Sequence, residues 1–394
     1  MAEPRDALIT GIGLLSSLGE GVEAHWAALD RPGGFRPSVD EARFAPYPVH
    51  PMVPLELDRQ IPRRGDQRQM EPWQRIGTYA SGLALESAGL KGDAERLTRM
   101  DMVVAAGGGE RDYAVDAAIL SELSSAAEPD VRLNERLTAD LRPTLFLAQL
   151  SNLLAGNISI VHGVVGSSRT FMGEEAAGVD AIRVACAKIA AGQSDTCLVG
   201  GAYNAERADV LLLYEMGRAL WKGPYQPVWA RQGAGGGIVF GSLGCFLVLE
   251  SREHAAARGA PAFAHIAAIA SDWSRRRPGE AAANAERVLG RMPLDPSAAA
   301  VISGASGLLK PTAAEREFLA NLSLPARAAA TALGHSLEPS FPASLALAAI
   351  AIAKGRLFGP LEAAELPMED ALRQVLVTGW GHWRGEGLAV VEAA

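Results

Sequence analysis

The chain has 394 residues, 48% of them hydrophobic and 21% charged, a composition that can bury a large core in two domains or one duplicated unit. Its 37 lysines and arginines are outnumbered by 45 aspartates and glutamates. The resulting net charge of -8 argues against a nucleic-acid footprint spread over the whole molecule. We therefore expect a globular protein without a nucleic-acid partner.

Cysteine usage and hydropathy bear on the compartment. Cys186, Cys197 and Cys245 have neither the paired spacing of a disulfide framework nor that of a zinc site. The opening MAEPRDALITGIG lacks the basic and then apolar pattern of a secretory signal. No later apolar run approaches the roughly 20 residues that span a bilayer. The sequence therefore predicts a cytoplasmic protein that is not inserted in a membrane.

Short apolar runs stopped by glycine predict buried strands, and apolar residues three or four positions apart predict helices. In chain order, the sequence predicts a strand at 7–13, helices at 22–29 and 73–90, a strand at 101–106, a helix at 176–191, strands at 196–199 and 245–250, a helix at 251–259, a strand at 265–270 and a helix at 343–353. The Pro- and Arg-rich stretch 32–64 is predicted to be an excursion from these elements. The alternation predicts an α/β architecture with helices covering the sheets.

A boundary between two units is predicted near residues 250–260. The apolar, glycine-rich segment 234–250 leads into a charged helix, after which a second alternating half begins. We expect an N-terminal unit at 1–250 and a C-terminal unit at 251–394.

Five segments, in order along the chain, resemble the β-ketoacyl-acyl-carrier-protein synthase family. LITGIGLLSSLGEG resembles the family's first strand and turn, VVAAGGG its next glycine-stopped strand, and GQSDTCLVGGAYNAE the strand after the nucleophile helix. GCFLVLESREHAAARGAP is similar to the crossover between the halves, and ALGHSLEPSFPASLALAAIAIAKG to the second histidine loop and its helix. The resemblance implies a duplicated, five-layered αβαβα fold of the thiolase type that dimerises through its N-terminal half.

The family's nucleophile is a cysteine at the start of a buried helix, where the helix dipole favours the thiolate. Counting back from Gly200 and matching Gly178 and Ile182 places Glu175 at that position. Cys186, in VACA, lies in mid-helix and is interpreted as a structural cysteine. A carboxylate cannot hold the acyl chain as a thioester, and its charge repels the malonyl carboxylate. The resemblance thus implies that transacylation fails in this chain.

The family's remaining catalytic residues are two histidines, which stabilise the enolate left by decarboxylation, and a lysine. The first histidine motif aligns with VISGASG and puts Ser303 at the histidine position. The second aligns with GHS and keeps His335, while Ala330 stands at the position of the upstream lysine. The C-terminal gating loop reads GWGHWRGEG, with bulky Trp380 and Trp383 that would obstruct acyl access. These losses imply that the chain does not condense.

Degenerate members that pair with an active synthase are the family's chain-length factors, and this sequence resembles them. The resemblance implies a heterodimer with a catalytic ketosynthase in fatty-acid or polyketide biosynthesis, with polyene and very-long-chain products both open. The residues expected at the tunnel or the subunit interface are Thr170, Phe171, Met172, Glu174, Trp380 and His382. For Phe171 and Met172, plain core packing is an equally good interpretation. For Glu174 and Glu175, helix capping or a salt bridge at the interface is at least as good an interpretation.

Other functions are also compatible with the sequence. Family members with glutamine in place of the nucleophile decarboxylate malonyl groups without condensing, although Glu175 and Ser303 weaken that reading. A 3-oxoacyl-carrier-protein synthase with unusual chemistry would use Glu175 as a general base with a raised pKa. Self-association into an inert homodimer is a further alternative.

Arginines gather between residues 59 and 75, where they could dock an acidic acyl carrier protein. They are Arg59, Arg63, Arg64, Arg68 and Arg75. A solvated basic face is the alternative. The resemblance implies no cofactor and no metal, and His50, His162 and His382 lack the spacing of a metal site.

Overall fold

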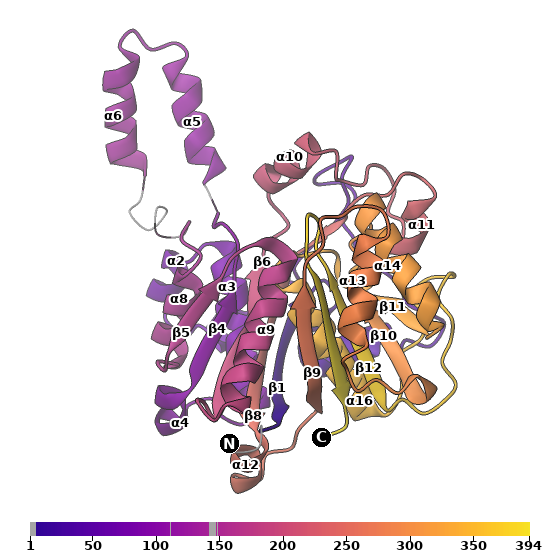
Figure 1. Ribbon diagram of the computed structural model, residues 1–394. Coiled ribbons are helices and arrows are strands. Elements are labelled where there is room, and N and C mark those ends of the chain that lie inside the picture. Colours follow the sequence, from indigo (N-terminus) through magenta and orange to yellow (C-terminus); the bar gives the residue numbers. More distant parts are fainter. Residues whose placement is uncertain (1–4, 111, 142–146, 148) are drawn as a thin grey trace.

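The computed structural model describes residues 5–110, 112–141, 147 and 149–394 (Figure 1). Ten strands follow one another along a continuous mixed sheet in the order β5-β4-β6-β8-β1-β9-β13-β12-β10-β11. The strands of the N-terminal half are β1 (Ala7–Ser16), β4 (Asp101–Ala105), β5 (Ser168–Phe171), β6 (Thr196–Tyr203) and β8 (Leu243–Ser251). Those of the C-terminal half are β9 (Ala264–Asp272), β10 (Ala299–Ser303), β11 (Ala326–Ala328), β12 (Gln374–Trp380) and β13 (Glu386–Glu392).

The two halves repeat one topology. In each half, the third strand in chain order lies at the outer edge, followed by the second, fourth, fifth and first strands. In each half the second strand pairs in parallel with the third and fourth, and the fifth is antiparallel to both of its neighbours. The same order and directions in both halves establish a duplicated fold. The halves join where β1 pairs with β9 over Leu8–His265 and Ile9–Ala264. Because this pairing makes the sheet continuous, the division at residue 250 stays a proposal.

Strand alternation explains why both faces of the sheet are covered. In β8, Cys245 and Leu247 point into the central core, whereas Phe246 and Val248 point into the outer core of the N-terminal half. A strand buried on both faces is apolar at every position, which is why the sequence showed continuous apolar runs instead of alternation.

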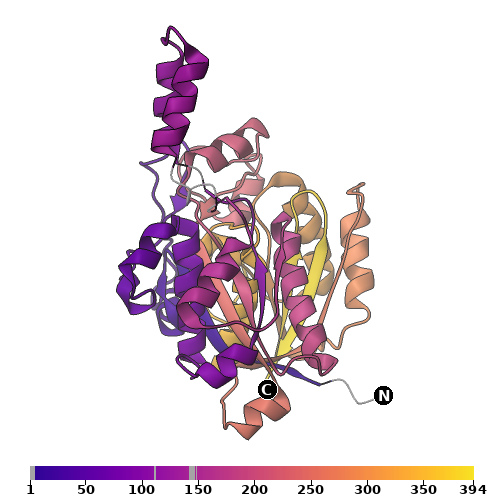
Figure 2. The same cartoon turned by 90° about the vertical axis from the view of Figure 1, so that its left-hand side faces the viewer.

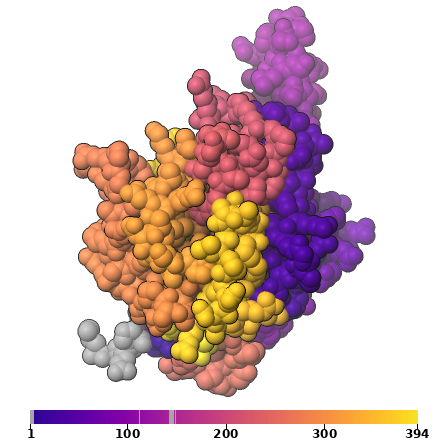
Figure 3. All heavy atoms as spheres, turned by 90° about the vertical axis from the view of Figure 1, so that its right-hand side faces the viewer, coloured from indigo at the N-terminus to yellow at the C-terminus, as the bar shows by residue number. Residues whose placement is uncertain are grey.

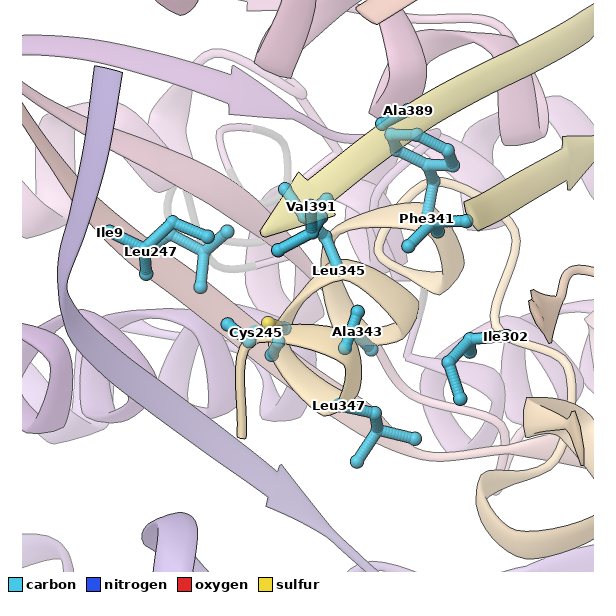
Figure 4. Close-up of a cluster of buried hydrophobic side chains, with 14 of the residues drawn as sticks. Ile9, Cys245, Leu247, Ile302, Phe341, Ala343, Leu345, Leu347, Ala389 and Val391 are labelled. Carbon is cyan, nitrogen blue, oxygen red and sulfur yellow. The ribbon is translucent and has the colours of Figure 1, made fainter. Parts of the chain in front are cut away.

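Two helices form the middle layer. They are α9 (Glu174–Ala190) and α16 (Ser340–Lys354), and the central core contains residues of both helices and of strands from both halves. Figure 4 shows Ala343, Leu345 and Leu347 of α16 among side chains of the two halves. Small residues on both helices allow the close approach that a layer between two sheet faces requires.

The outer layers complete a five-layered α/β/α/β/α arrangement, confirming the fold implied by the resemblance. Helices α3 (Pro72–Ser87) and α8 (Leu153–His162) cover the N-terminal sheet, and α13 (Glu280–Leu289) and α14 (Leu309–Leu322) cover the C-terminal sheet. Figure 2 faces the N-terminal half and Figure 3 the C-terminal half. None of the helices in the described residues is long and apolar enough to cross a membrane.

The remaining elements lie mostly at the ends of the layers. The short helices are α1 (Gly21–Leu29), α2 (Arg64–Gln69), α4 (Ala94–Arg99), α10 (Ala208–Met216), α11 (Val228–Gln232), α12 (Arg252–Ala257) and α15 (Ala329–Leu333), and the short strands are β2 (Gly19–Glu20), β3 (Val49–His50) and β7 (Phe240–Gly241). Helices α5 (Tyr113–Leu123) and α6 (Pro129–Asp140) form a hairpin that projects from the body (Figure 1). The sequence did not predict this hairpin.

The close packing of α3 against β1 gives a stability test. A Cβ added at Gly13 would lie 1.9 Å from the Ala80 carbonyl oxygen, so we expect Gly13→Ala to lower the free energy of unfolding by at least about 2 kcal/mol. Gly65→Ala is the control, because an added Cβ there meets nothing within 4 Å and helix propensity favours alanine by up to about 1 kcal/mol. Urea unfolding measures both, and equal stabilities of the two variants would contradict this packing.

Candidate functional site

The site is built at the start of α9, directly after edge strand β5. Gly173 adopts φ 126° and Glu174 φ 59°, so two successive residues take left-handed backbone conformations before the helix continues. A non-glycine residue in this region carries strain of order 1 kcal/mol and marks a turn that the surrounding structure imposes. The turn directs the side chain of Glu175 into the protein, where it is 3% exposed.

Glu175 and His335 form a buried pair between the two halves. Glu175 Oε1 lies 2.8 Å from His335 Nε2, and the backbone N–H of His382 donates to Glu175 Oε2 over 3.2 Å. Burial alone would raise the pKa of Glu175, but the hydrogen bond and positive charge of His335 outweigh it and hold the pKa below its usual value. Both carboxylate oxygens are therefore already hydrogen bonded.

The backbone around His335 is fixed by the segment that contains β7. The His335 N–H donates to the Val239 carbonyl over 2.9 Å, and its carbonyl accepts from Gly241 N over 2.9 Å. Its Nδ1 is buried and has no hydrogen-bond partner among the described residues. The imidazole ring of His335 is thus positioned by its main chain and by the hydrogen bond between Nε2 and Glu175.

Ser303 and Ala330 flank this pair without supplying a catalytic group. The Ser303 hydroxyl at the end of β10 donates to Glu315 Oε1 over 2.7 Å, and Thr378 also donates to that carboxylate. Burial raises the pKa of Glu315. Ala330 lies in α15 and, with His335, lines a cavity of about 10 Å³, room for roughly one water. The aligned positions therefore converge in space, and Glu175 and His335 are the two among them that carry a titratable group.

A larger cavity of about 690 Å³ opens on the other side of the start of α9. Phe171, Met172, Glu174 and Trp383 line it, and Met172 and Trp383 are about two-thirds exposed, at 64% and 66%. Burial, followed by the charge of Glu175, raises the pKa of Glu174 to about 7. Thr170 lies in β5 and is not among the lining residues. The structure thus gathers three of the expected tunnel residues on one hollow surface.

The expected role of Trp380 at the acyl path needs correction. Trp380 ends β12, and strand alternation turns Gly379 inward, where an added Cβ would meet Phe341 and Val179. Trp380 therefore points outward, 1% exposed, with its ring centroid 5.9 Å from that of Phe318. It packs the outer core of the C-terminal half instead of blocking a route to Glu175.

His382 lies beside the buried pair. Its ring contacts that of Trp383 in a tilted arrangement, with centroids 4.2 Å apart and 48° between the planes, and meets Tyr214 edge-on at 6.0 Å. Its backbone contact with Glu175 links the segment between β12 and β13 to the start of α9. Arg64 and Arg68 lie on α2 and Arg63 precedes it, and all three are exposed and line neither cavity beside the pair.

The structure adds a carboxyl group that sequence reasoning missed. Glu338 follows His335 by three positions and is 4% exposed. Burial, reinforced by the charge of Glu175, raises its pKa to about 7. An acidic residue within the otherwise apolar stretch after GHS was the signal that could have revealed it. No group of His, Cys, Asp and Glu in the described parts of the chain could hold a metal ion.

Comparison with known proteins now assigns the family. The family model described as "Beta-ketoacyl synthase, N-terminal domain" matches residues 5–255, so the chain belongs to the β-ketoacyl synthase family. It is 26% identical over 270 residues to 3-oxoacyl-[acyl-carrier-protein] synthase 2 of Vibrio cholerae, covering 66% of this chain and 62% of that protein. It is 28% identical over 275 residues to putative polyketide beta-ketoacyl synthase 1 of Streptomyces halstedii, covering 68% and 63%.

A solved structure with the same fold is the ishigamide ketosynthase/chain length factor. It matches with a TM-score of 0.78 at 20% identity over 99% of this chain and 100% of that chain. At this identity the match shows the fold, which is that of thiolase-like ketosynthases. The aligned region spans 62% and 63% of the length of the two curated relatives above.

The buried carboxyls make stability depend on pH. Glu338 titrates near pH 7 in the folded protein and near 4.5 when unfolded, so the folded state binds more protons between these values and stability falls as pH rises through that window. We expect Glu338→Gln to flatten this fall and to stabilise the protein at pH 8 by on the order of 2 kcal/mol relative to the wild type.

Urea unfolding at pH 5, 6, 7 and 8 measures this effect. Glu95→Gln, at an exposed carboxyl, is the matched control and should leave the slope unchanged. An identical pH dependence in Glu338→Gln and the wild type would contradict the assignment.

Proposed function

We propose that this chain is a non-condensing subunit of the chain-length-factor type, which pairs with an active ketosynthase in fatty-acid or polyketide assembly. The observation that carries the proposal is the Glu175–His335 pair. A carboxylate occupies the start of α9, where the family places its nucleophile, and both its oxygens are engaged by His335 and the His382 N–H. A carboxylate held in this way cannot form a thioester with an acyl chain, and its negative charge repels the carboxylate of a malonyl group.

The surroundings of the pair support the same conclusion. Ser303, at the first histidine position, is committed to Glu315, and Ala330 offers only a methyl group at the lysine position. Decarboxylation without condensation would need donors aimed at the developing enolate. His335 alone, with its Nε2 directed at Glu175, supplies too little, so we place malonyl decarboxylation and an unusual synthase activity second.

The partner and the carrier are proposed on separate grounds. The similarity to a ketosynthase/chain length factor structure suggests a homologous ketosynthase as the partner, with a homodimer as the alternative. Arg63, Arg64 and Arg68, at the start of α2 and on it, are exposed and have no ion-pair partner among the described residues, so they are free to meet an acidic surface. The acyl carrier protein named with the Vibrio synthase is the acidic partner that we propose for them, through steered, salt-dependent encounter.

Intact-protein mass spectrometry tests the central claim. The purified chain is incubated with malonyl- and acyl-carrier protein, alone and with a cognate ketosynthase. We expect turnover only in the mixture and the acyl adduct only on the partner. Cys186→Ser is the matched control and should change nothing, because burial raises the pKa of that thiol to about 12. Condensation by this chain alone, or an adduct on it, would overturn the proposal.

A tunnel role for the cavity at the start of α9 predicts altered products. In the reconstituted pair, we expect Phe171→Ala and Met172→Ala to shift product length, because both side chains line that cavity. Ile160→Ala, at an apolar side chain that is 68% exposed on α8, controls for loss of surface hydrophobicity. Products are compared by liquid chromatography with mass spectrometry, and unchanged lengths in both lining variants would exclude the tunnel role.

A further inference from the structure

A cavity of about 380 Å³ lies between β6, α10, the glycines that follow β4 and the loop after His335. Three aromatic residues line it, Trp73, Tyr203 and Tyr214, and aliphatic side chains complete the walls. It shares no lining residue with the larger cavity at the start of α9. The two cavities are therefore separate sites, and neither pairing nor the tunnel role assigns a ligand to the smaller one.

Glu338 places a carboxyl group at the wall of this cavity. The residue lines the cavity and is 4% exposed. An added Cβ at Gly107, another lining residue, would lie 2.6 Å from Glu338 Oε1, so this oxygen rests against the glycine. Its hydrogen-bond donors are the backbone N–H groups of Glu174 and of Glu338 itself. No arginine, lysine or histidine of the described residues forms an ion pair with this carboxyl group, so its negative charge has no cation to offset it.

The cation that lines the cavity is already engaged. Arg207 pairs with Asp209, which also lines the cavity, and donates to the Gly109 carbonyl over 3.0 Å. The charge of Arg207 is therefore offset within the wall. An anionic ligand would meet the unpaired carboxylate of Glu338 without a free cation to bind, so an anion does not fit this cavity.

Negative charge also acts on the cavity from the direction of α9. Burial, followed by the charges of Glu175, Glu174 and Glu338, raises the pKa of the Tyr214 phenol. Aromatic rings attract ammonium groups to their negative faces, and a nearby carboxylate adds a direct attraction of charge. A metal ion would need several oxygen or nitrogen ligands, and no group in the described parts of the chain supplies such a set. An organic ammonium ion meets each of these constraints.

We propose that this cavity binds a small organic ammonium ion, with the ammonium group beside the Glu338 carboxylate and the alkyl part among the aromatic walls. The inference goes beyond the proposed function, because neither pairing nor a tunnel requires a cation site. A bound cation would offset the negative charge that Glu174, Glu175 and Glu338 bring together at the start of α9. Occupancy of the cavity is therefore expected to stabilise the folded protein.

Direct binding tests this inference. The full-length chain is titrated by calorimetry with choline, with n-butylammonium, with 3,3-dimethylbutan-1-ol, which is the uncharged isostere of choline, and with butyrate. We expect at least one ammonium ion to bind about tenfold more tightly than the alcohol, a difference of about 1.4 kcal/mol, and butyrate not to bind. Glu338→Gln should remove this preference, because it deletes the charge and keeps the size of the side chain.

Glu95→Gln is the matched control, because it removes an exposed carboxyl group that does not line this cavity, and it should keep the preference. Gly108→Leu is a second cavity variant. An added Cβ at Gly108 meets nothing within 4 Å, so the leucine side chain would occupy part of the cavity and should abolish binding of the ammonium ion. Thermal melting checks that each variant is folded.

Four outcomes would overturn the inference. They are equal affinities for the ammonium ions and the alcohol, no binding of either ammonium ion, a preference that survives both Glu338→Gln and Gly108→Leu, and an equal rise in melting temperature with potassium chloride at the same concentration. Because the titration needs no partner subunit, these outcomes are separate from failure of the pairing experiment.

Discussion

The two-helix central layer is the constraint on which the rest of the structure depends. Helices α9 and α16 must fit between two sheet faces that are themselves buried, so small residues recur along both helices. An added Cβ at Gly178 of α9 would lie 2.2 Å from the Glu338 carbonyl oxygen, which shows how closely the first turns of α9 approach the segment before α16. This approach brings groups from both halves of the duplication to one place.

At that place lies the hydrogen-bonded pair of Glu175 and His335. Glu175 and His335 come from different halves, and the pair is nearly fully buried. Breaking one partner of such a pair would leave an uncompensated buried charge, so the pair fixes how the halves meet. Within the C-terminal half, Ser303 donates a second buried hydrogen bond to Glu315. The Glu175–His335 hydrogen bond therefore joins the two halves at this point.

The described residues also line two cavities of different character near the buried pair. One is open and lined by Phe171, Met172 and Trp383, and the other is lined by Tyr203 and Glu338 beneath α10. Carboxyls with pKa values raised to about 7 face both of them, Glu174 on one side and Glu338 on the other. Burial therefore keeps these two carboxyl groups partly protonated near neutral pH, whereas in water each of them would be ionised.

Much of this could be predicted from the sequence. Apolar runs stopped by glycine marked β1, β4, β6 and β8, and helical spacing marked α3, α9 and α16, because local periodicity reports burial on one or both faces. The family resemblance added the duplication and pointed to Glu175, Ser303, Ala330 and His335, of which the first three differ from the residues that the resemblance leads one to expect. The outward direction of Trp380, the Glu175–His335 pair and the burial of Glu338 were decided only by the tertiary structure. Each depends on which groups from distant segments are brought into contact, and a linear pattern contains no record of those distances.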